Sequence, residues 1–111
     1  MPKYLALFSY ADGAMAAMIE TPAEREPAVR RALEGVGAEV ESFYWMFGAY
    51  DGVSVVVAPD SLTMAGISAA IRSTGTVHSE THELFTASDV QQILATAARV
   101  RANFTEPGAA G

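Results

Sequence analysis

Two short apolar runs separated by a glycine-containing segment form the clearest pattern along the chain. The first run, Val40–Phe47, is rich in aromatic side chains, and the second, Val53–Ala58, consists largely of valine. Runs of this kind, joined by a few residues that include Gly and Asp, are typical of a β-hairpin. We therefore predict two antiparallel strands joined by a turn over Gly48–Gly52, where glycine adopts backbone angles that a Cβ disfavours.

Both faces of this hairpin are apolar. Side chains alternate along a strand, so Phe43, Trp45 and Phe47 point to one side, and Tyr44 and Met46 point to the other. An antiparallel sheet that is covered on one side only normally has a polar second face. We therefore expect helices of this chain to cover one face of the sheet and something else to cover the other.

Two further segments also alternate as strands do. Lys3–Tyr10 carries Tyr4, Phe8 and Tyr10 on one side and two leucines on the other. Thr76–Phe85 alternates in the same way but is mostly polar. These two segments bring the predicted sheet to four strands.

Helical signals fill the first gap between strands. We expect a short helix over Gly13–Ile19 with Asp12 as its N-cap. The segment Thr21–Glu24 resembles a capping box that would start a second helix. Because a proline inside a helix removes a hydrogen bond and clashes with the preceding turn, Pro27 predicts either a kink or a new start at Glu26 or Pro27.

Helical periodicity recurs in three more places. Apolar residues from Val29 to Val36 follow the spacing of an amphipathic helix. After the hairpin, Asp60 is the expected N-cap of a helix that Gly75 ends. The segment Thr86–Asp89 resembles a capping box, with Asp in place of Glu, for a last helix that runs to about Ala102.

The resulting order is β-α-β-β-α-β with an additional C-terminal helix. This order predicts an α+β, ferredoxin-like fold, in which two helices cover one face of a four-stranded antiparallel sheet. We expect the uncovered face to carry the aromatic residues and to be an interface, because exposed apolar patches of that size usually are. Face-to-face packing of two copies, as in a dimeric α/β-barrel, would bury it in a homodimer or higher homo-oligomer.

Composition narrows the class of protein. The chain has 111 residues, half of them hydrophobic, which predicts one domain over residues 1–102, and residues 103–111 form a tail that we expect to fray. The absence of cysteine excludes disulfides and thiolate chemistry and suits a cytoplasmic protein. A net charge of −6 argues against nucleic-acid binding. Neither a signal peptide nor a membrane-spanning run is evident, and no motif indicates a cofactor.

Several landmarks together resemble the GYD-domain family. They are the opening Met1–Leu5, the strand end Phe8–Tyr10, the Gly48–Asp51 turn before an apolar run, and Ala58–Asp60. The resemblance extends from Met1 to about Ala98. It implies a ferredoxin-like fold that associates through its sheets, with Gly48, Tyr50 and Asp51 as the motif residues, but it implies no activity. The polar fourth strand departs from the family pattern.

Tyr50 and Asp51 are the first candidates for chemistry. In a structural role, Asp51 would satisfy backbone amides of the turn and Tyr50 would pack on a sheet edge. In a catalytic role, the two would lie at the mouth of a pocket as a hydrogen-bond donor and a general base. The structural role is favoured, because Gly and Asp are common in turns for local reasons.

His78, Glu80 and His82 are the second candidates. They share one face of a strand, where neighbours lie about 6.6 Å apart, so an adjacent pair could chelate a metal or act in acid–base chemistry. A polar edge strand that discourages further pairing is the simpler explanation. We favour it, and predict no metal site, because no third protein ligand is visible elsewhere.

The third group consists of aromatic residues that would line an apolar ligand pocket if they are not simply core or interface. The candidate ligand-binding residues are Phe8, Tyr10, Tyr44, Trp45 and Arg72, of which Arg72 would pair with Glu80 or hold an anionic ligand. We predict an oligomeric protein that binds a small apolar or aromatic molecule. A cofactor-independent isomerase, cyclase or oxygenase, with His78, His82, Tyr50 and Asp51 as catalytic residues, and a purely structural subunit remain open alternatives.

Overall fold

The computed structural model describes residues 1–108 of the chain. Its strands pair antiparallel in the order β2-β3-β1-β4, and they comprise β1 (Lys3–Tyr10), β2 (Glu39–Trp45), β3 (Gly52–Val57) and β4 (Val77–Leu84). The helices within these residues are α1 (Asp12–Glu20), α2 (Glu26–Glu34), α3 (Ser61–Ser73) and α4 (Asp89–Asn103). The fold is therefore α+β, and its strand order follows the ferredoxin-like pattern that the sequence predicts.

The first two helices begin differently from the sequence-based expectation. Asp12 is the first residue of α1 and Ala11 is its N-cap, so the predicted capping role of Asp12 is wrong. Thr21–Glu24 is not helical, and α2 begins only at Glu26, so the capping box predicted at Thr21–Glu24 does not start a helix. Pro27 lies in its first turn, where the missing N–H has no intrahelical partner to lose, so the predicted fresh start is confirmed.

The other two helix starts agree with the sequence. Asp60 caps α3, and its Oδ1 accepts a hydrogen bond from the Thr63 amide at 2.8 Å. Thr86 and Asp89 bond reciprocally, since each backbone amide donates to the side chain of the other residue. This reciprocal pair is the predicted capping box at the start of α4, and α4 ends one residue beyond the expected Ala102.

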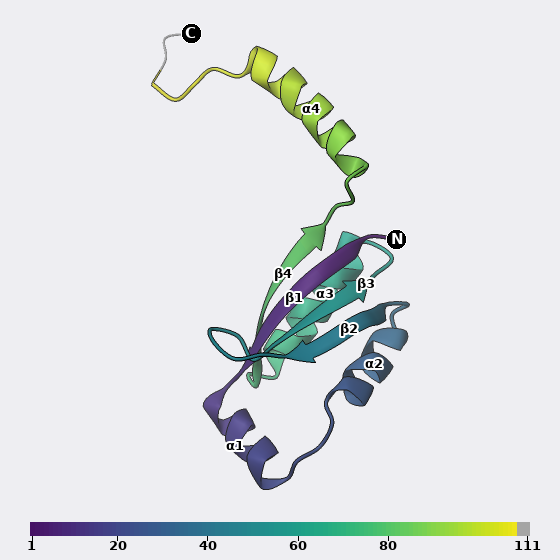
Figure 1. Cartoon of the computed structure of the whole chain (residues 1–111), viewed down its shortest axis with the longest axis vertical. Coiled ribbons are helices and arrows are strands. Elements are labelled where there is room, and N and C mark those ends of the chain that lie inside the picture. The colour runs from purple at the N-terminus through teal and green to yellow at the C-terminus, as the bar shows by residue number, and fades with distance from the viewer. Residues whose placement is uncertain (109–111) are drawn as a thin grey trace.

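The two faces of the sheet differ in a way that the sequence alone did not reveal. Helices α2 and α3 both lie on one side of the sheet (Figure 1), which we call the helix face, and Tyr4 and Phe8 of β1 are buried beneath them. The opposite side, the open face, carries Leu5, Leu7, Val53, Val55 and Val57, all half-buried, and the exposed Tyr44. The expectation that the uncovered face is the aromatic one is therefore wrong.

An irregularity in β2 puts Phe43 and Trp45 on the helix face. The register between β2 and β3 shifts between Val40 and Ser42, so that one extra residue of β2 is accommodated there. Beyond the shift, Phe43 pairs with Ser54 and Trp45 pairs with Gly52. Strand β2 ends at Trp45, and the fully exposed Phe47 belongs to the loop rather than to the predicted strand.

The hydrophobic core lies between the helix face and the two covering helices. Leu33 of α2 and Met64 and Ile67 of α3 are buried against Tyr4 and Val56 of the sheet. The Tyr4 hydroxyl lies 3.0 Å from Ser61 Oγ at the start of α3, which satisfies the polar end of this buried ring. Burial of these side chains is the main reason that α2 and α3 stay on this face.

Helices α1 and α4 lie outside this core. Neither helix has a buried residue, and α4 extends away from the sheet beyond the end of β4 (Figure 1). The radius of gyration is 18.4 Å, against about 13 Å for a compact chain of this length.

No helix within residues 1–108 is long and apolar enough to cross a membrane. Of the tail that we expect to fray, residues 109–111 lie outside the described residues.

Candidate functional site

The Gly48–Asp51 turn ties the β2–β3 hairpin to the end of β1. Gly48 has a φ of +122°, which side chains with a Cβ rarely adopt. The Asp51 amide donates to the Phe8 carbonyl at 2.8 Å, and Asp51 Oδ2 accepts from the Tyr10 amide at 2.8 Å. The side chain of Asp51 thus satisfies a backbone amide of a neighbouring strand, rather than an amide within its own turn.

Because Gly52 has no side chain, the Phe8 ring has room to lie against it. The two residues pair directly across β1 and β3. A Cβ on Gly52 would come within 2.2 Å of Phe8 Cζ and 2.9 Å of the Tyr44 carbonyl oxygen, closer than real contacts allow. The ring of Phe8 therefore lies over bare backbone, with Phe43 at 5.3 Å and Tyr10 at 5.8 Å between ring centroids.

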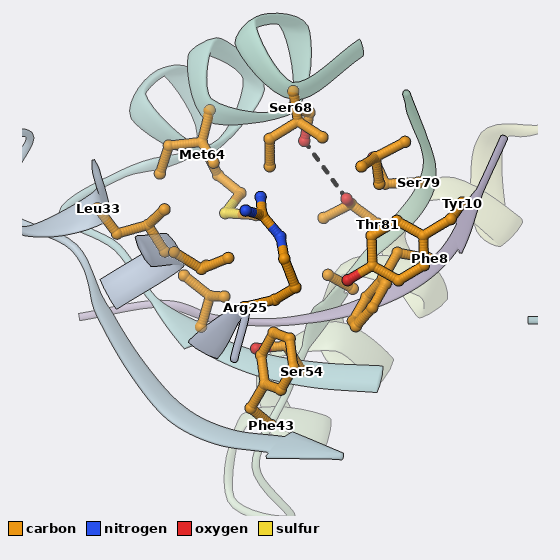
Figure 2. Close-up of a pocket in the computed structure, with 16 residues that line it drawn as sticks. Phe8, Tyr10, Arg25, Leu33, Phe43, Ser54, Met64, Ser68, Ser79 and Thr81 are labelled. Carbon is orange, nitrogen blue, oxygen red and sulfur yellow. Dashed lines mark hydrogen bonds between the residues drawn. The ribbon is translucent and has the colours of Figure 1, made fainter. Parts of the chain in front are cut away.

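These aromatic rings border a cavity between the helix face, α2 and α3. Its volume is about 110 Å³, and its walls are mainly apolar. Figure 2 shows the sixteen residues that line it, which include Phe8, Tyr10, Phe43, Met64 and Ile71. The β1 residues reach it because alternate side chains of that strand point beneath the helices.

A few polar groups interrupt the apolar lining. The Ser54 hydroxyl donates to the Ser42 carbonyl at 2.9 Å, and the hydroxyls of Ser68 and Thr81 lie 3.4 Å apart. Arg25, the N-cap of α2, extends its side chain into the space between Met64 and Tyr10 (Figure 2). It is the only lining residue of the cavity that is charged at neutral pH.

The hydroxyl of Tyr10 is also at the cavity. Burial raises the pKa of Tyr10 above its ordinary value, and the neighbouring Arg25 cation offsets part of that increase. The hydroxyl is therefore protonated at neutral pH. The indole of Trp45 stacks on the Tyr10 ring, with 5.5 Å between centroids, so the single tryptophan of the chain contacts the cavity wall.

A second polar cluster lies on the open face. The Tyr50 hydroxyl donates to Glu80 Oε2 at 3.1 Å, and His82 Nε2 lies 2.9 Å from the same oxygen. The hydrogen bond with His82, and then the one from Tyr50, lower the pKa of Glu80, while the same carboxylate raises the pKa of Tyr50. These three residues are close enough for proton exchange, but they lie on the opposite side of the sheet from the cavity.

The structure distributes the candidate residues over three places. Phe8 and Tyr10 line the cavity, and Trp45 touches it through Tyr10. Tyr44 and the His78–Glu80–His82 row belong to the open face, as their register with β1 and β3 requires. Arg72 does not pair with Glu80, which was one of the roles considered for it; it lines a separate surface hollow next to α3 together with His78.

No metal centre emerges from this arrangement. Within residues 1–108, no group of three or more His, Asp or Glu side chains is placed to hold a metal ion. Glu80 and His82 form a close pair, and the catalytic roles considered for His78, His82, Tyr50 and Asp51 remain predictions.

Sequence reasoning missed Arg25 and the residues that α2 and α3 contribute to the cavity. A helix that starts at Thr21–Glu24 would place Arg25 in its interior. A stricter interpretation of Pro27 as a first-turn residue would have placed Arg25 at the N-cap of α2. The lining residues Met64, Ile67 and Ile71 belong to the apolar face of α3, a pattern that core packing alone also explains.

Comparison with known proteins supports the fold. The crystal structure of TTHA0845 from Thermus thermophilus superposes with a TM-score of 0.51 at 22% sequence identity, covering 78% of this chain and 96% of that one. None of the curated proteins that were compared matches the chain. Residues 4–94 match the GYD domain, and this range includes the Gly48–Asp51 turn and, apart from Lys3, the four described strands. The chain therefore belongs to the GYD domain family.

Proposed function

We propose that this GYD domain protein binds a small, largely apolar molecule in the cavity between its sheet and its covering helices. The supporting observation is the mainly apolar space of about 110 Å³ bordered by Phe8, Tyr10 and Phe43. An apolar cavity of about 150 Å³ in another protein accommodates benzene, so the part of the ligand enclosed here is no larger than about one ring.

Binding is favoured over catalysis by the chemistry of the lining. Among the lining residues, Tyr10 has a hydroxyl that its raised pKa keeps protonated at neutral pH, and Arg25 is a cation; neither accepts a proton there. General acid–base catalysis also needs a group that accepts a proton. Of the groups considered for that role, His78, Glu80 and His82 lie on the open face, and Asp51 accepts a hydrogen bond from the Tyr10 amide and is not among the lining residues.

Binding of neutral apolar probes tests the proposal. We expect benzene or toluene, added to the full chain, to shift the amide NMR resonances of Val77, Ser79 and Thr81 and to saturate. The Ala6→Leu variant should remove these shifts, because Ala6 lines the cavity and a larger side chain would fill it. The matched control is Ala69→Leu, at an exposed alanine of α3 outside this cavity, which should bind as the unmodified chain does. Probes that never saturate would refute the proposal.

We also propose that a second copy of the chain covers the open face, so that two sheets pack face to face as in a dimeric α/β-barrel. Leu5, Leu7 and Val55 lie at the centre of this face, and no segment within residues 1–108 covers them. The same chain also has an uncovered amphipathic helix, α4, with exposed Ile93 and Leu94. A symmetric pair is self-complementary, so each copy would present both surfaces to the other.

The mass of the protein in solution tests this assembly. We expect light scattering to give a molecular mass of two or more times the 11.7 kDa of one chain. Leu7→Glu should lower that mass by placing a charge in the interface, whereas Leu62→Glu, at an exposed leucine of α3, should not. Circular dichroism would check that both variants fold. A monomeric mass for the unmodified chain would contradict the proposal.

A further inference from the structure

We infer that the cavity is built for an anion: a small monocarboxylate whose apolar body fills the cavity and whose carboxylate pairs with Arg25. The inference rests on the proposed binding function and names the chemical class of the ligand. Among the sixteen lining residues, Arg25 is the only one that carries a charge at neutral pH. A ligand with one negative charge would complement it.

Arg25 has no carboxylate partner in the part of the chain that the structure describes, residues 1–108. The acidic residue that follows it, Glu26, pairs instead with Arg30 at 3.0 Å. The remaining ion pairs in these residues, Lys3–Glu41 and Glu80–His82, lie elsewhere on the molecule. Arg25 is exposed at the N-cap of α2, so its guanidinium is accessible to a ligand that enters the cavity and supplies a counter-ion.

The shape of the guanidinium selects the anionic group. Its parallel N–H donors match the two oxygens of a carboxylate, which they hold through two hydrogen bonds. The Tyr10 hydroxyl, protonated at neutral pH, is a further donor at the same wall. The rest of the ligand, beyond its carboxylate, would be apolar, because Val29, Leu33 and Met64 line the surrounding walls.

The size of the cavity limits the apolar body. A volume of about 110 Å³ holds a single ring or a short branched aliphatic group, but not a fused ring system. Aromatic and branched aliphatic monocarboxylates share this chemistry. Benzoate and isovalerate are suitable probes, and their amides, benzamide and isovaleramide, have nearly the same shape without the charge.

Calorimetric titration of the full chain at neutral pH compares each acid with its amide. We expect each carboxylate to bind roughly tenfold or more tightly than its amide, because hydrogen bonds to charged groups are the stronger ones. Trp45, the only tryptophan, stacks on Tyr10 and provides a second readout through its fluorescence.

Variants assign the preference to one residue. Arg25→Gln should weaken carboxylate binding to about the level of amide binding and change amide binding much less, and Arg25→Lys should restore part of the difference. Arg31→Gln, at an exposed arginine of the same helix, should behave as the unmodified chain. Equal affinity for acid and amide, or an unchanged preference in Arg25→Gln, would overturn the inference and leave the proposed function standing. If the carboxylates and neutral benzene all fail to bind, both this inference and the proposed function are refuted.

Discussion

The backbone amide of Tyr10 donates a hydrogen bond to Oδ2 of Asp51 at 2.8 Å, across 41 positions of sequence. The Asp51 amide in turn donates to the Phe8 carbonyl, so the aspartate of the Gly-x-Tyr-Asp turn is bonded twice to the end of β1. Tyr10 and Phe8 both line the cavity. The motif that marks the family thus fixes the strand end that supplies the aromatic wall.

Loss of the Asp51 carboxylate should therefore destabilise the domain. We expect Asp51→Ala to lower the free energy of unfolding by about 1–3 kcal/mol, because the Tyr10 amide loses a charged acceptor. Asp51→Asn, which keeps one carbonyl oxygen, should cost less. Urea denaturation measures both, with Asp12→Ala at an exposed aspartate of α1 as the control. Equal stability of Asp51→Ala and the control would contradict this role.

The contact between Gly52 and Phe8 predicts a second stability effect. Gly52→Ala would place its Cβ 2.2 Å from Phe8 Cζ, and relief of that overlap should cost roughly 1–3 kcal/mol or more of unfolding free energy. In the Phe8→Leu background the same substitution should cost less, since the ring is gone. Gly66→Ala is the matched control: no atom lies within 4 Å of its Cβ position on α3, so it should stabilise by about 0.5–1 kcal/mol. Additive effects of Gly52→Ala and Phe8→Leu would refute the direct contact.

The proximity of Arg25 to Tyr10 can be measured through the ionisation of the phenol. Burial raises the pKa of Tyr10, and the Arg25 cation lowers it. Arg25→Gln should therefore raise the pKa of Tyr10 further, whereas Arg31→Gln should leave it unchanged. Carbon-13 NMR of the Tyr10 Cζ across an alkaline titration would measure the pKa. An unchanged value in Arg25→Gln would show that the guanidinium does not reach the ring.

The Tyr50–Glu80–His82 cluster predicts a pH dependence of stability. The folded-state pKa of Glu80 is lowered, first by its hydrogen bond with His82 and then by that from Tyr50. The stabilisation is therefore present above the ordinary pKa of 4.5 and is lost as the pH falls through the lower folded-state value. We expect Glu80→Gln to have a lower Tm than the unmodified chain at neutral pH, and the difference to shrink below about pH 4.5. A difference that persists in strong acid, or one matched by Glu24→Gln at an exposed glutamate, would contradict this assignment.

The amino-acid sequence by itself determined the elements and their order. Alternation in Lys3–Tyr10 and Val53–Ala58, the capping bonds of Asp60 and Thr86, and the hairpin turn are local features, so neighbouring residues suffice to predict them. The same holds for the shared face of His78, Glu80 and His82, which follows from the two-residue period of a strand.

Only the tertiary structure decided which face of the sheet the helices cover. Alternation identifies the residues that share a face, but the direction of the two crossover connections determines where α2 and α3 pack. The register shift in β2 then brought Phe43 and Trp45 to that side, and the start of α2 at Glu26 brought Arg25 to the cavity. The candidate site depends on contacts between segments far apart in sequence, which no local pattern contains.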